Sequence, residues 1–398
     1  MFFGKTAPRV DTSEEKVEAL LSRSVVEPIP SRESFKKLLM SGKRLRVKLG
    51  IDPTSPHLHL GRSVPLLKLR DFQELGHQVV LIAGDFTGLI GDTSDKESER
   101  PMLDEATVAK NMTTYREQAG KLLDLHAIEF RRNSEWLAKL GYREIGEQAD
   151  QFSVADFISR ELIKKRLDEG KRVSLREVLY PLMQGYDSVA IKADIELGST
   201  DQRFNLLAGR TLQEHYGQPA QHILLLGPLL PGTDGRKMSS SWGNTVNLTE
   251  APQEMFGKLM SIPDALTEQY LTHVTRLPLA RVAELMAGHP KAAKVALAKE
   301  VVRMYHTEAA AEKAAADFES TFSKGEAPKD APEIPFRETL MKTLVEGGTV
   351  PSNAEYRRLQ EAGAIRYADT DEVFSGSGAV IGKVMRVGKH RFVKIIEK

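Results

Sequence analysis

The stretch Pro53-Thr-Ser-Pro-His-Leu-His-Leu-Gly-Arg62 decides the fold of the first half of this chain. It follows a short apolar segment at 46–51 and precedes residues with helical apolar spacing up to about residue 75. A strand that enters a helix through such a turn leaves backbone N–H groups at the helix start, where the helix dipole also favours an anion. His59 and Arg62 add side-chain donors, and Gly61 allows a ligand to approach the backbone closely. The stretch predicts an anion site, although an ordinary structural turn explains the same residues.

A second stretch, Gly235-Arg-Lys-Met-Ser-Ser-Ser241, lies much later and follows an apolar run at 222–230. It combines two cations and three hydroxyls beside a glycine, which is a composition suited to binding polyphosphate. The alternative interpretation is a solvated surface turn.

Composition and length indicate an ordinary globular protein of two or three domains, with 398 residues, of which 41% are hydrophobic and 28% charged. The net charge of +1 means that any contact with RNA depends on a local basic patch. The absence of cysteine excludes disulfides, thiolate nucleophiles and cysteine-based zinc sites. We find no apolar run of the roughly 18 residues that span a bilayer and no signal-peptide pattern at the N-terminus. We therefore expect a soluble, cytoplasmic protein without membrane contact.

Alternating strand and helix patterns predict an α/β fold. Apolar strands at 46–51 and 79–83 flank the helix that begins near residue 60, which favours a parallel sheet buried on both faces. Further strands are predicted at 128–132 and 194–197, and the residues 12–42 are predicted as two helical pieces. Parallel sheets bind ligands at the carboxyl ends of their strands, and Gly84 to Asp92 open at that edge.

The rest of the chain is predicted to add a helical part and a small terminal module. The expected organisation is a Rossmann-like domain at 1–227 with a helical insertion at about 137–173, a linking segment at 228–249, an all-helical domain at 250–322, a linker at 323–334 and an α+β module at 335–398.

A predicted helix at about 175–191 carries Tyr180, Gln184 and Asp187 at spacing i, i+4, i+7, which places them on one narrow stripe. A polar outer face is the alternative interpretation of this stripe. The strand at 194–197 then leads to the turn Gly198-Ser-Thr-Asp-Gln202.

The C-terminal end is basic, because residues 383–398 contain six Lys or Arg against one Glu. A nearby short helix carries Arg357 and Arg358. A basic β-rich segment beside paired arginines suits contact with an RNA backbone, and a solvated charged surface is the equally weighted alternative.

Taken together, the two stretches resemble the paired HIGH and KMSKS signatures of the class I aminoacyl-tRNA synthetases. His59 to Arg62 matches the first signature except at its last position, and Lys237 to Ser241 matches the second except that Ser240 replaces a lysine. The stripe at Tyr180, Gln184 and Asp187 resembles the amino-acid site of tyrosyl-tRNA synthetases. The turn at 198–202 resembles the Gly-Gly-Thr-Asp-Gln segment of that family, with Ser199 in place of the second glycine. The tail resembles the RNA-binding module named after ribosomal small-subunit protein four. The resemblance covers essentially the whole chain and is closest to bacterial enzymes with Val-Lys-Leu-Gly-x-Asp-Pro-Thr before the first signature.

This resemblance implies a two-step reaction in which tyrosine and ATP form tyrosyl-adenylate and pyrophosphate, and the tyrosyl group then passes to tRNA-Tyr. No protein nucleophile is required, so catalysis depends on alignment and on cations near the leaving phosphates. ATP is expected to arrive with Mg²⁺, without a metal site or a tightly bound cofactor of the protein. The family also implies that 1–227 is the catalytic domain and 250–322 the anticodon-side domain. It further implies a homodimer, with the insertion as its usual contact.

Position-by-position matching implies roles for individual residues. The catalytic set is Thr54, His59, Arg62, Lys237, Ser239 and Ser240. The ATP-binding set is Gly50, Asp52, Gly61, Asp201 (on the ribose) and Lys237. The tyrosine-binding set is Asp187 for the phenol, Tyr180, Gln184 and Asp92 for the ammonium, Gln202 near the carboxylate, and Lys48. The tRNA-binding set is Arg357, Arg358, Lys389 and Arg391.

Three departures from the family pattern carry their own expectations. Lys48 stands where many relatives have a tyrosine that shares the phenol, and is expected to pair with Asp187 or another acid. Arg62 replaces a histidine and is expected to compensate for the lysine missing at Ser240.

Two other functions stay open at this point: a tryptophanyl-type synthetase, and a non-catalytic RNA-binding protein on a synthetase scaffold.

Overall fold

The computed structural model describes residues 9–92, 102–323, 331–388 and 391–397. Contacts divide the chain into two compact units, one of residues 1–250 with 262–293 and one of residues 251–261 with 294–398. The predicted helical stretch 250–322 is therefore shared between the two units. Each unit is described by itself below.

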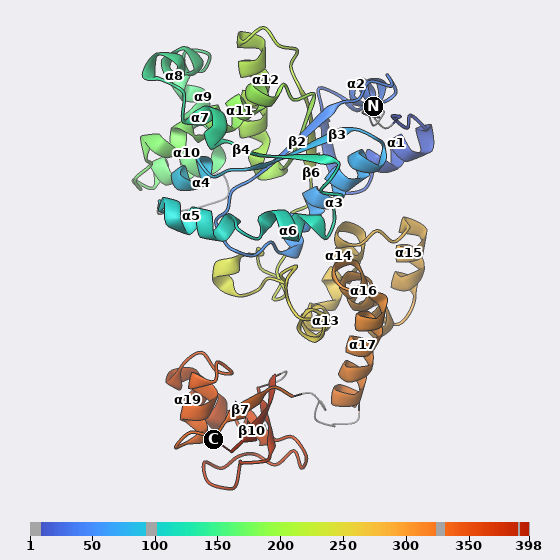
Figure 1. Ribbon diagram of the computed structural model, residues 1–398, viewed down its shortest axis with the longest axis vertical. Helices are drawn as coiled ribbons and strands as arrows, with labels where there is room; N and C mark the ends of the chain where they lie inside the picture. The colour runs from blue at the N-terminus through green and yellow to red at the C-terminus, as the bar shows by residue number, and fades with distance from the viewer. Residues whose placement is uncertain (1–8, 93–101, 324–330, 389–390, 398) are drawn as a thin grey trace, which may run out of the picture. The chain divides into compact units, whose positions relative to one another are not determined.

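A six-stranded sheet forms the centre of the first unit (Figure 1). Its spatial order is β1-β6-β5-β2-β3-β4, and all neighbouring pairs are parallel except β1 with β6. The strands are β1 (Val25–Ile29), β2 (Arg46–Ile51), β3 (Gln78–Ala83), β4 (Ile128–Arg132), β5 (Ile195–Ser199) and β6 (His222–Leu226). The predicted α/β class with a Rossmann-like parallel sheet is confirmed.

Helices connect and cover these strands. The first unit contains α1 (Glu14–Leu20), α2 (Arg32–Leu39), α3 (Leu60–Glu74), α4 (Thr87–Ile90), α5 (Glu105–Met112), α6 (Tyr115–Gly120), α7 (Ser134–Leu137), α8 (Tyr142–Ala149), α9 (Val154–Ile158), α10 (Glu161–Asp168), α11 (Leu175–Ile191), α12 (Arg203–His215), α14 (Thr267–Val274) and α15 (Leu279–Ala287). Helix α3 packs on β2, β3 and β5, whereas α12 packs on β5, β6 and the length of α11. Val80 and Ile82 of β3 face the end of α11 at Ile191.

The prediction of two helical pieces at 12–42 missed strand β1, which lies between α1 and α2. Its five residues include Pro28, and a proline weakens the expectation of a strand because it cannot donate to a ladder. The strand is tolerated because it lies at the edge of the sheet, antiparallel to β6.

The turn after β2 is held in place by a distant segment. His59 is the N-cap residue of α3. The Leu60 N–H donates to the Val246 carbonyl, and the Leu248 N–H donates to the Leu58 carbonyl. The first signature stretch is therefore linked by main-chain hydrogen bonds to the segment that follows the second, next to the start of α3.

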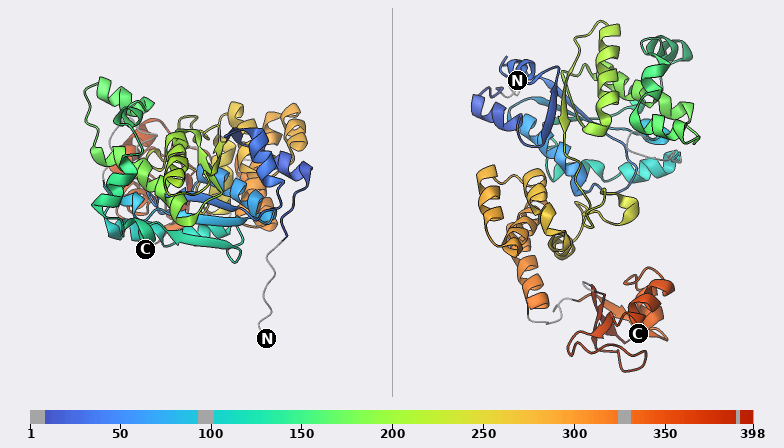
Figure 2. Two further views of the ribbon diagram at one scale, coloured as in Figure 1. Left: turned by 90° about the horizontal axis from the view of Figure 1, so that it is seen from above. Right: turned by 180° about the vertical axis from the view of Figure 1, so that it is seen from behind.

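The second unit contains helices and a small sheet (Figure 2). Its elements are α13 (Pro252–Ser261), most of α16 (Pro290–Tyr305), α17 (Glu308–Ser323), β7 (Glu333–Pro335), α18 (Leu340–Glu346), α19 (Asn353–Glu361), β8 (Ile365–Tyr367), β9 (Val384–Val387) and β10 (Arg391–Ile396). The tail has a core of its own, in which Leu344, Tyr356 and Met385 are buried together. The start of β7 pairs with β10, so residues 333–334 belong to the sheet and not to the predicted linker.

Within the described ranges, no helix has both the length and the apolar character needed to cross a membrane.

Candidate active site

A cavity of about 400 Å³ opens at the carboxyl edge of the large sheet, within the first unit. It is lined by the ends of β2 and β5, the turn before α3, the inner face of α11 and the loop after β6. Among the predicted site residues, those that line it are Gly50, Asp52, Thr54, His59, Gly61, Arg62, Asp92, Tyr180, Gln184, Asp187, Asp201, Gln202, Lys237, Ser239 and Ser240. Residues from four distant stretches of sequence are thus brought to one place, as the family resemblance implies.

Asp187 lies on the buried face of α11 at the cavity wall and is 3% exposed. The Trp136 indole N–H donates to its Oδ1 at 2.7 Å, and the Asn133 amide donates to its Oδ2 at 3.4 Å. Burial raises the pKa of the Asp187 carboxyl to about 7, against the opposing effects of the Lys48 charge and these two donors. The site therefore holds a hydrogen-bond acceptor whose charge changes near neutral pH.

Asp52 forms a second buried carboxyl group. The Tyr180 hydroxyl donates to its Oδ2 at 2.8 Å, and the Thr87 hydroxyl donates to its Oδ1 at 2.7 Å. Burial raises the pKa of Asp52 to about 6, while the two hydroxyl donors act in the opposite direction. Both oxygens of Asp52 are thus engaged by protein hydroxyls, which orients the Tyr180 ring.

Lys48 does not line the cavity but lies below it, fully buried. Its Nζ is 2.9 Å from Oε1 of Glu196, so the acid that the sequence left open is Glu196 and not Asp187. Lys48, which the resemblance put in the tyrosine-binding set, therefore uses its ammonium for groups of the protein. Lys48 and Glu196 are direct partners in the pairing of β2 with β5.

His59 stands where the turn meets α3, and its environment keeps it neutral. Burial, together with the nearby Arg62 charge, lowers the pKa of the His59 imidazole to about 3. At neutral pH, His59 is therefore a hydrogen-bond donor without charge, and the fixed cations in this part of the cavity wall are Arg62 and Lys237.

The loop that carries Lys237 is held by Asn244, which is 3% exposed and was not anticipated from the sequence. Asn244 accepts from the Ser239 N–H at 2.9 Å and donates to Asp234 at 2.8 Å and to the Lys237 carbonyl at 3.0 Å. Lys237 itself is exposed. The main chain of the loop is therefore constrained while its lysine side chain reaches toward solvent.

The turn after β5 begins a short 3₁₀ helix at Thr200–Gln202. The Ser199 hydroxyl donates to Oδ1 of Asp201, and the Gln202 amide donates to Oδ2 of Asp92 at 2.6 Å. Ser199, which departs from the family's glycine, has φ −76°, so the serine is accommodated in an ordinary conformation.

The predicted tRNA-binding residues belong to the second unit. Arg357 and Arg358 are exposed on α19, and Arg358 forms an ion pair with Glu355 at 2.8 Å. Arg391 donates to the Thr349 carbonyl at 2.7 Å, which gives it a role in the fold of the tail. Lys389 lies outside the described residues. Two other basic residues of the tail are paired, Lys383 with Asp369 at 2.7 Å and Lys394 with Glu333 at 2.8 Å.

Comparison with known proteins is consistent with this site. The family model described as tRNA synthetases class I (W and Y) matches residues 40–323. Tyrosine–tRNA ligases of Moorella thermoacetica and Carboxydothermus hydrogenoformans are 44% and 45% identical to the chain, over 94% and 97% of its length and 94% and 99% of theirs. The same fold occurs in a mitochondrial tyrosyl-tRNA synthetase of Aspergillus nidulans, with a TM-score of 0.65 at 22% identity, covering 78% of this chain and 95% of that one. It also occurs in the tyrosyl-tRNA synthetase of Archaeoglobus fulgidus, solved with L-tyrosine, with a TM-score of 0.61 at 23% identity over 77% and 100% of the two chains.

The chain belongs to the class I tRNA synthetases of the tryptophan and tyrosine family. Within that family its place is among the tyrosyl-tRNA synthetases, because its near full-length bacterial relatives are tyrosine–tRNA ligases. The predicted family is confirmed.

Proposed function

We propose that the protein activates tyrosine with ATP and transfers the tyrosyl group to tRNA-Tyr. The observation that carries the assignment of tyrosine is Asp187, a buried carboxyl group held by Trp136 and Asn133 at the cavity wall. A phenol that donates to this carboxylate is bound, whereas a side chain without a hydroxyl leaves a buried acceptor unpaired. Tyrosyl-tRNA synthetases are themselves a known example of such discrimination, in which tyrosine is preferred to phenylalanine without editing.

The backbone end of the amino acid would lie against Tyr180, Gln184, Asp92 and Gln202. Since Tyr180 uses its proton to donate to Asp52, its oxygen is left to accept from an ammonium group. Asp92 adds a carboxylate acceptor, and Gln202 lies next to it at 2.6 Å. Asp52 orients Tyr180 through the hydrogen bond between them and, as a carboxyl group that lines the cavity, stays in the proposed ATP-binding set.

ATP would occupy the part of the cavity between the two signature stretches. Gly50 and Gly61 line this part of the cavity, where an added Cβ at Gly50 would meet no atom within 4 Å, and Asp201 would accept from the ribose. Thr54 and His59 would donate to phosphate oxygens as neutral groups, together with the hydroxyls of Ser239 and Ser240. Mg²⁺ would enter as part of the ATP substrate.

In the first step a carboxylate oxygen of tyrosine attacks the α-phosphorus, and the bond to the bridging oxygen breaks, so that pyrophosphate leaves with the charge. Arg62 and Lys237 are the cations available to stabilise that charge. In the second step a ribose hydroxyl of the tRNA attacks the tyrosyl carbonyl carbon and AMP leaves. Alignment of the reactants supplies the remaining catalysis.

The partners follow from this reaction. The tail with Arg357 and Arg358 is the proposed tRNA contact, and the cytoplasm is the proposed location. A homodimer through residues 137–173 is supported by apolar side chains that this segment leaves in solvent: Tyr142, Val154, Ile158 and Leu167 are 96%, 73%, 40% and 43% exposed.

Amino-acid-dependent exchange between ATP and pyrophosphate, measured with tyrosine, phenylalanine and tryptophan in parallel, tests the proposal. We expect exchange with tyrosine alone. Exchange driven by tryptophan would overturn the assignment of Asp187. Folded protein that binds tRNA but exchanges with no amino acid would instead indicate an RNA-binding protein on a synthetase scaffold.

A further inference from the structure

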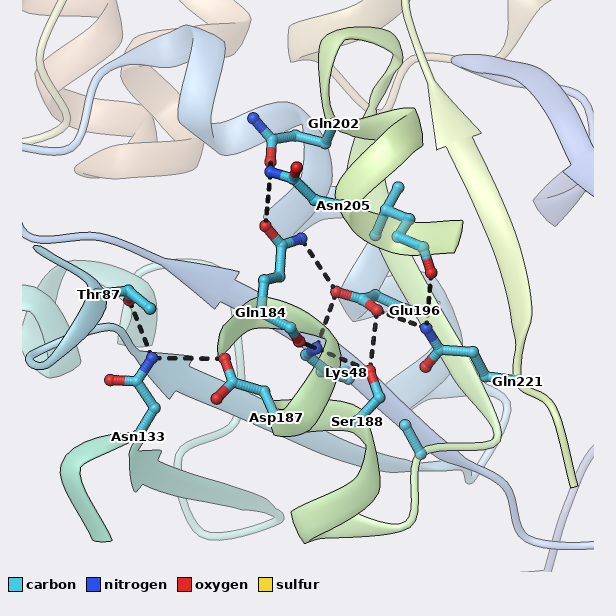
Figure 3. A network of polar contacts seen from close by, with 12 residues as sticks. Lys48, Thr87, Asn133, Gln184, Asp187, Ser188, Glu196, Gln202, Asn205 and Gln221 are labelled. Atoms are coloured by element: carbon cyan, nitrogen blue, oxygen red, sulfur yellow. Dashed lines mark hydrogen bonds and ion pairs between the residues drawn. The ribbon is translucent and has the colours of Figure 1, made fainter. Parts of the chain in front are cut away.

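A buried polar network lies behind the wall of the cavity (Figure 3). At its centre Lys48 and Glu196 are 0% and 1% exposed and form an ion pair at 2.9 Å. The Lys48 ammonium also donates to the Gln184 carbonyl at 2.9 Å and to the Ser188 hydroxyl at 2.8 Å. Its three protons therefore have three acceptors, two of them on α11.

Glu196 is surrounded by donors. Besides Lys48, its carboxylate accepts from Gln184 Nε2 at 3.3 Å, from Ser188 Oγ at 3.0 Å and from Gln221 Nε2 at 2.6 Å. An ionised carboxylate can only accept hydrogen bonds. Gln184 must therefore turn its amide nitrogen toward Glu196 and its amide oxygen away.

A chain of amides continues from this point to the cavity (Figure 3). Asn205 Nδ2 donates to Oε1 of Gln184 at 3.1 Å and to Oε1 of Gln202 at 3.0 Å. Gln202 Nε2 then donates to Oδ2 of Asp92 at 2.6 Å. The chain ends at one side in the Glu196 carboxylate and at the other in the Asp92 carboxylate, and both can only accept. The NH₂ group of Asn205 donates to the glutamine on each side of it. Only one orientation of each amide group is compatible with these hydrogen bonds.

We propose that Lys48 and Glu196 are positioning residues for the amino-acid substrate, which set the amide orientation of Gln184 and, through Asn205, that of Gln202. Gln184, Gln202 and Asp92 line the cavity, whereas Lys48, Glu196 and Asn205 lie behind it. The inference rests on the proposed function, in which those three lining residues meet the ammonium and carboxylate of tyrosine.

Helix α12 has a glycine, Gly209, where it passes this network. A Cβ atom at Gly209 would lie 2.6 Å from Gln221 Nε2 and 3.1 Å from Ser188 Oγ. Glycine at this helical position therefore leaves room for the donors that surround Glu196, although it lowers helix propensity.

The test uses the full-length enzyme and tyrosine-dependent ATP–pyrophosphate exchange. Glu196→Gln keeps the shape of the side chain but removes its charge and adds a donor facing Gln184. Asn205→Leu removes the central donor of the chain without burying a charge, and so remains informative if the first variant folds poorly. Each variant is expected to raise the KM for tyrosine about tenfold, with kcat and the KM for ATP within about twofold of wild type.

The double variant shows whether the two residues act through one hydrogen-bond network or whether each substitution causes a separate structural defect. Residues of one network are coupled, so Glu196→Gln/Asn205→Leu is expected to raise the KM no further than the more severe single variant. Arg166→Met is the matched control, since Arg166 and Glu177 form another fully buried ion pair at 2.6 Å, with exposures of 1% and 0%, away from the cavity lining. It is expected to lower the melting temperature and leave the KM for tyrosine unchanged.

Multiplicative effects of the two single substitutions on the KM would overturn the proposal. The proposal would also be overturned if the variants lost thermal stability, as is expected of Arg166→Met, while their KM for tyrosine stayed unchanged. Lys48 and Glu196 would then have a structural role only. Both results require active wild-type protein. A wild type without tyrosine-dependent exchange would overturn the proposed function itself, and is thereby distinguished from a failure of the positioning role.

Discussion

Asp187 lies at the wall of the cavity with a pKa of about 7, raised by its burial. The protonated form prevails below that pH and accepts a phenol hydrogen bond less well than the carboxylate does. The phenol of tyrosine keeps its proton between pH 6.5 and 8.5, because its pKa of about 10 lies above this range. The charge of Asp187 therefore controls the binding of the side chain over that interval.

The KM for tyrosine is expected to rise as the pH falls from 8.5 to 6.5, by up to about fourfold. The KM rises toward low pH because the Asp187 carboxylate is protonated as the pH drops through about 7. Steady-state exchange kinetics at a series of pH values provide the measurement. Asp187→Asn is the control and should give a flat KM profile; an unchanged slope in that variant would assign the pH dependence to another group.

Lys237 supplies the second prediction for a single residue. Removal of its ammonium by Lys237→Ala is expected to lower kcat for exchange about 10²- to 10³-fold, with the KM for tyrosine little changed, because its charge acts on the leaving phosphates. Pre-steady-state formation of tyrosyl-adenylate measures the step directly. Arg236→Ala is the neighbouring control, since Arg236 is paired with Asp234 at 2.6 Å and stacks over Trp242. A loss of equal size in both variants would argue against a specific role for Lys237.

Individual site residues were predictable where they belonged to a spaced motif. Tyr180, Gln184 and Asp187 share one stripe of a helix, as their spacing predicts, and their placement at the cavity was implied by the resemblance to tyrosyl-tRNA synthetases. Asn133, Asn205 and Asn244 were not foreseen, because each acts through contacts made by tertiary packing. The pairing of Glu196 with Lys48 could have been predicted. Both residues are charged and lie within buried strands, and a buried charge requires a partner.

At the scale of elements, the packing of α11 on α12 positions much of the site. Helix α11 carries Tyr180 and Asp187 toward the cavity, and α12 begins beside Gln202. The two helices approach closely at Gly185, where an added Cβ would lie 3.1 Å from the Ala208 carbonyl carbon and 3.1 Å from the Gly209 nitrogen. These atoms belong to the backbone and cannot move without shifting α12.

Gly185→Ala is therefore expected to destabilise the protein by about 1–3 kcal/mol, because the extra methyl group overpacks the interface. Gly146→Ala is the matched control: Gly146 lies in α8, where a Cβ would have no atom within 4 Å. That variant should be neutral or stabilised by about 0.5–1 kcal/mol. Urea unfolding of both variants measures the difference, and equal stabilities would contradict the close packing.

Most helices and strands were predictable from the sequence, because their apolar residues recur at regular helical or strand spacing over long segments. The 17 residues of α11 and the strands β2 to β5 lie near their predicted positions. Strand β1 was missed, since five residues with an internal proline give too weak a signal to reveal an antiparallel edge strand. The tail sheet begins two residues inside the predicted linker, because β7 is defined by its pairing with β10 and not by local composition.

At the scale of the whole molecule, the chemistry and the proposed RNA contact belong to different parts of the chain. The lining of the cavity lies between Leu49 and Ser240, in the first unit. The tail has its own sheet and core, which include Ile365 and Val393. Removal of the tail therefore tests the two roles separately.

Truncation after residue 330 is expected to leave tyrosine-dependent exchange within about twofold of wild type and to lower aminoacylation of tRNA-Tyr about tenfold or more, because phosphate contacts supply much of the affinity for RNA. Aminoacylation by the full chain should also weaken as salt is raised, whereas exchange should not. Parallel loss of both activities in the truncated protein would show that the tail supports the cavity.

The most direct test of the central claim is the ratio of kcat/KM for tyrosine to that for phenylalanine in ATP–pyrophosphate exchange, compared between wild type and Asp187→Asn. Recognition of the phenol by the buried carboxylate predicts a large preference for tyrosine in the wild type, which falls by about 10² or more in the variant while activity with phenylalanine is kept or improved. An unchanged preference in Asp187→Asn would show that another group recognises the phenol and would contradict the proposed site.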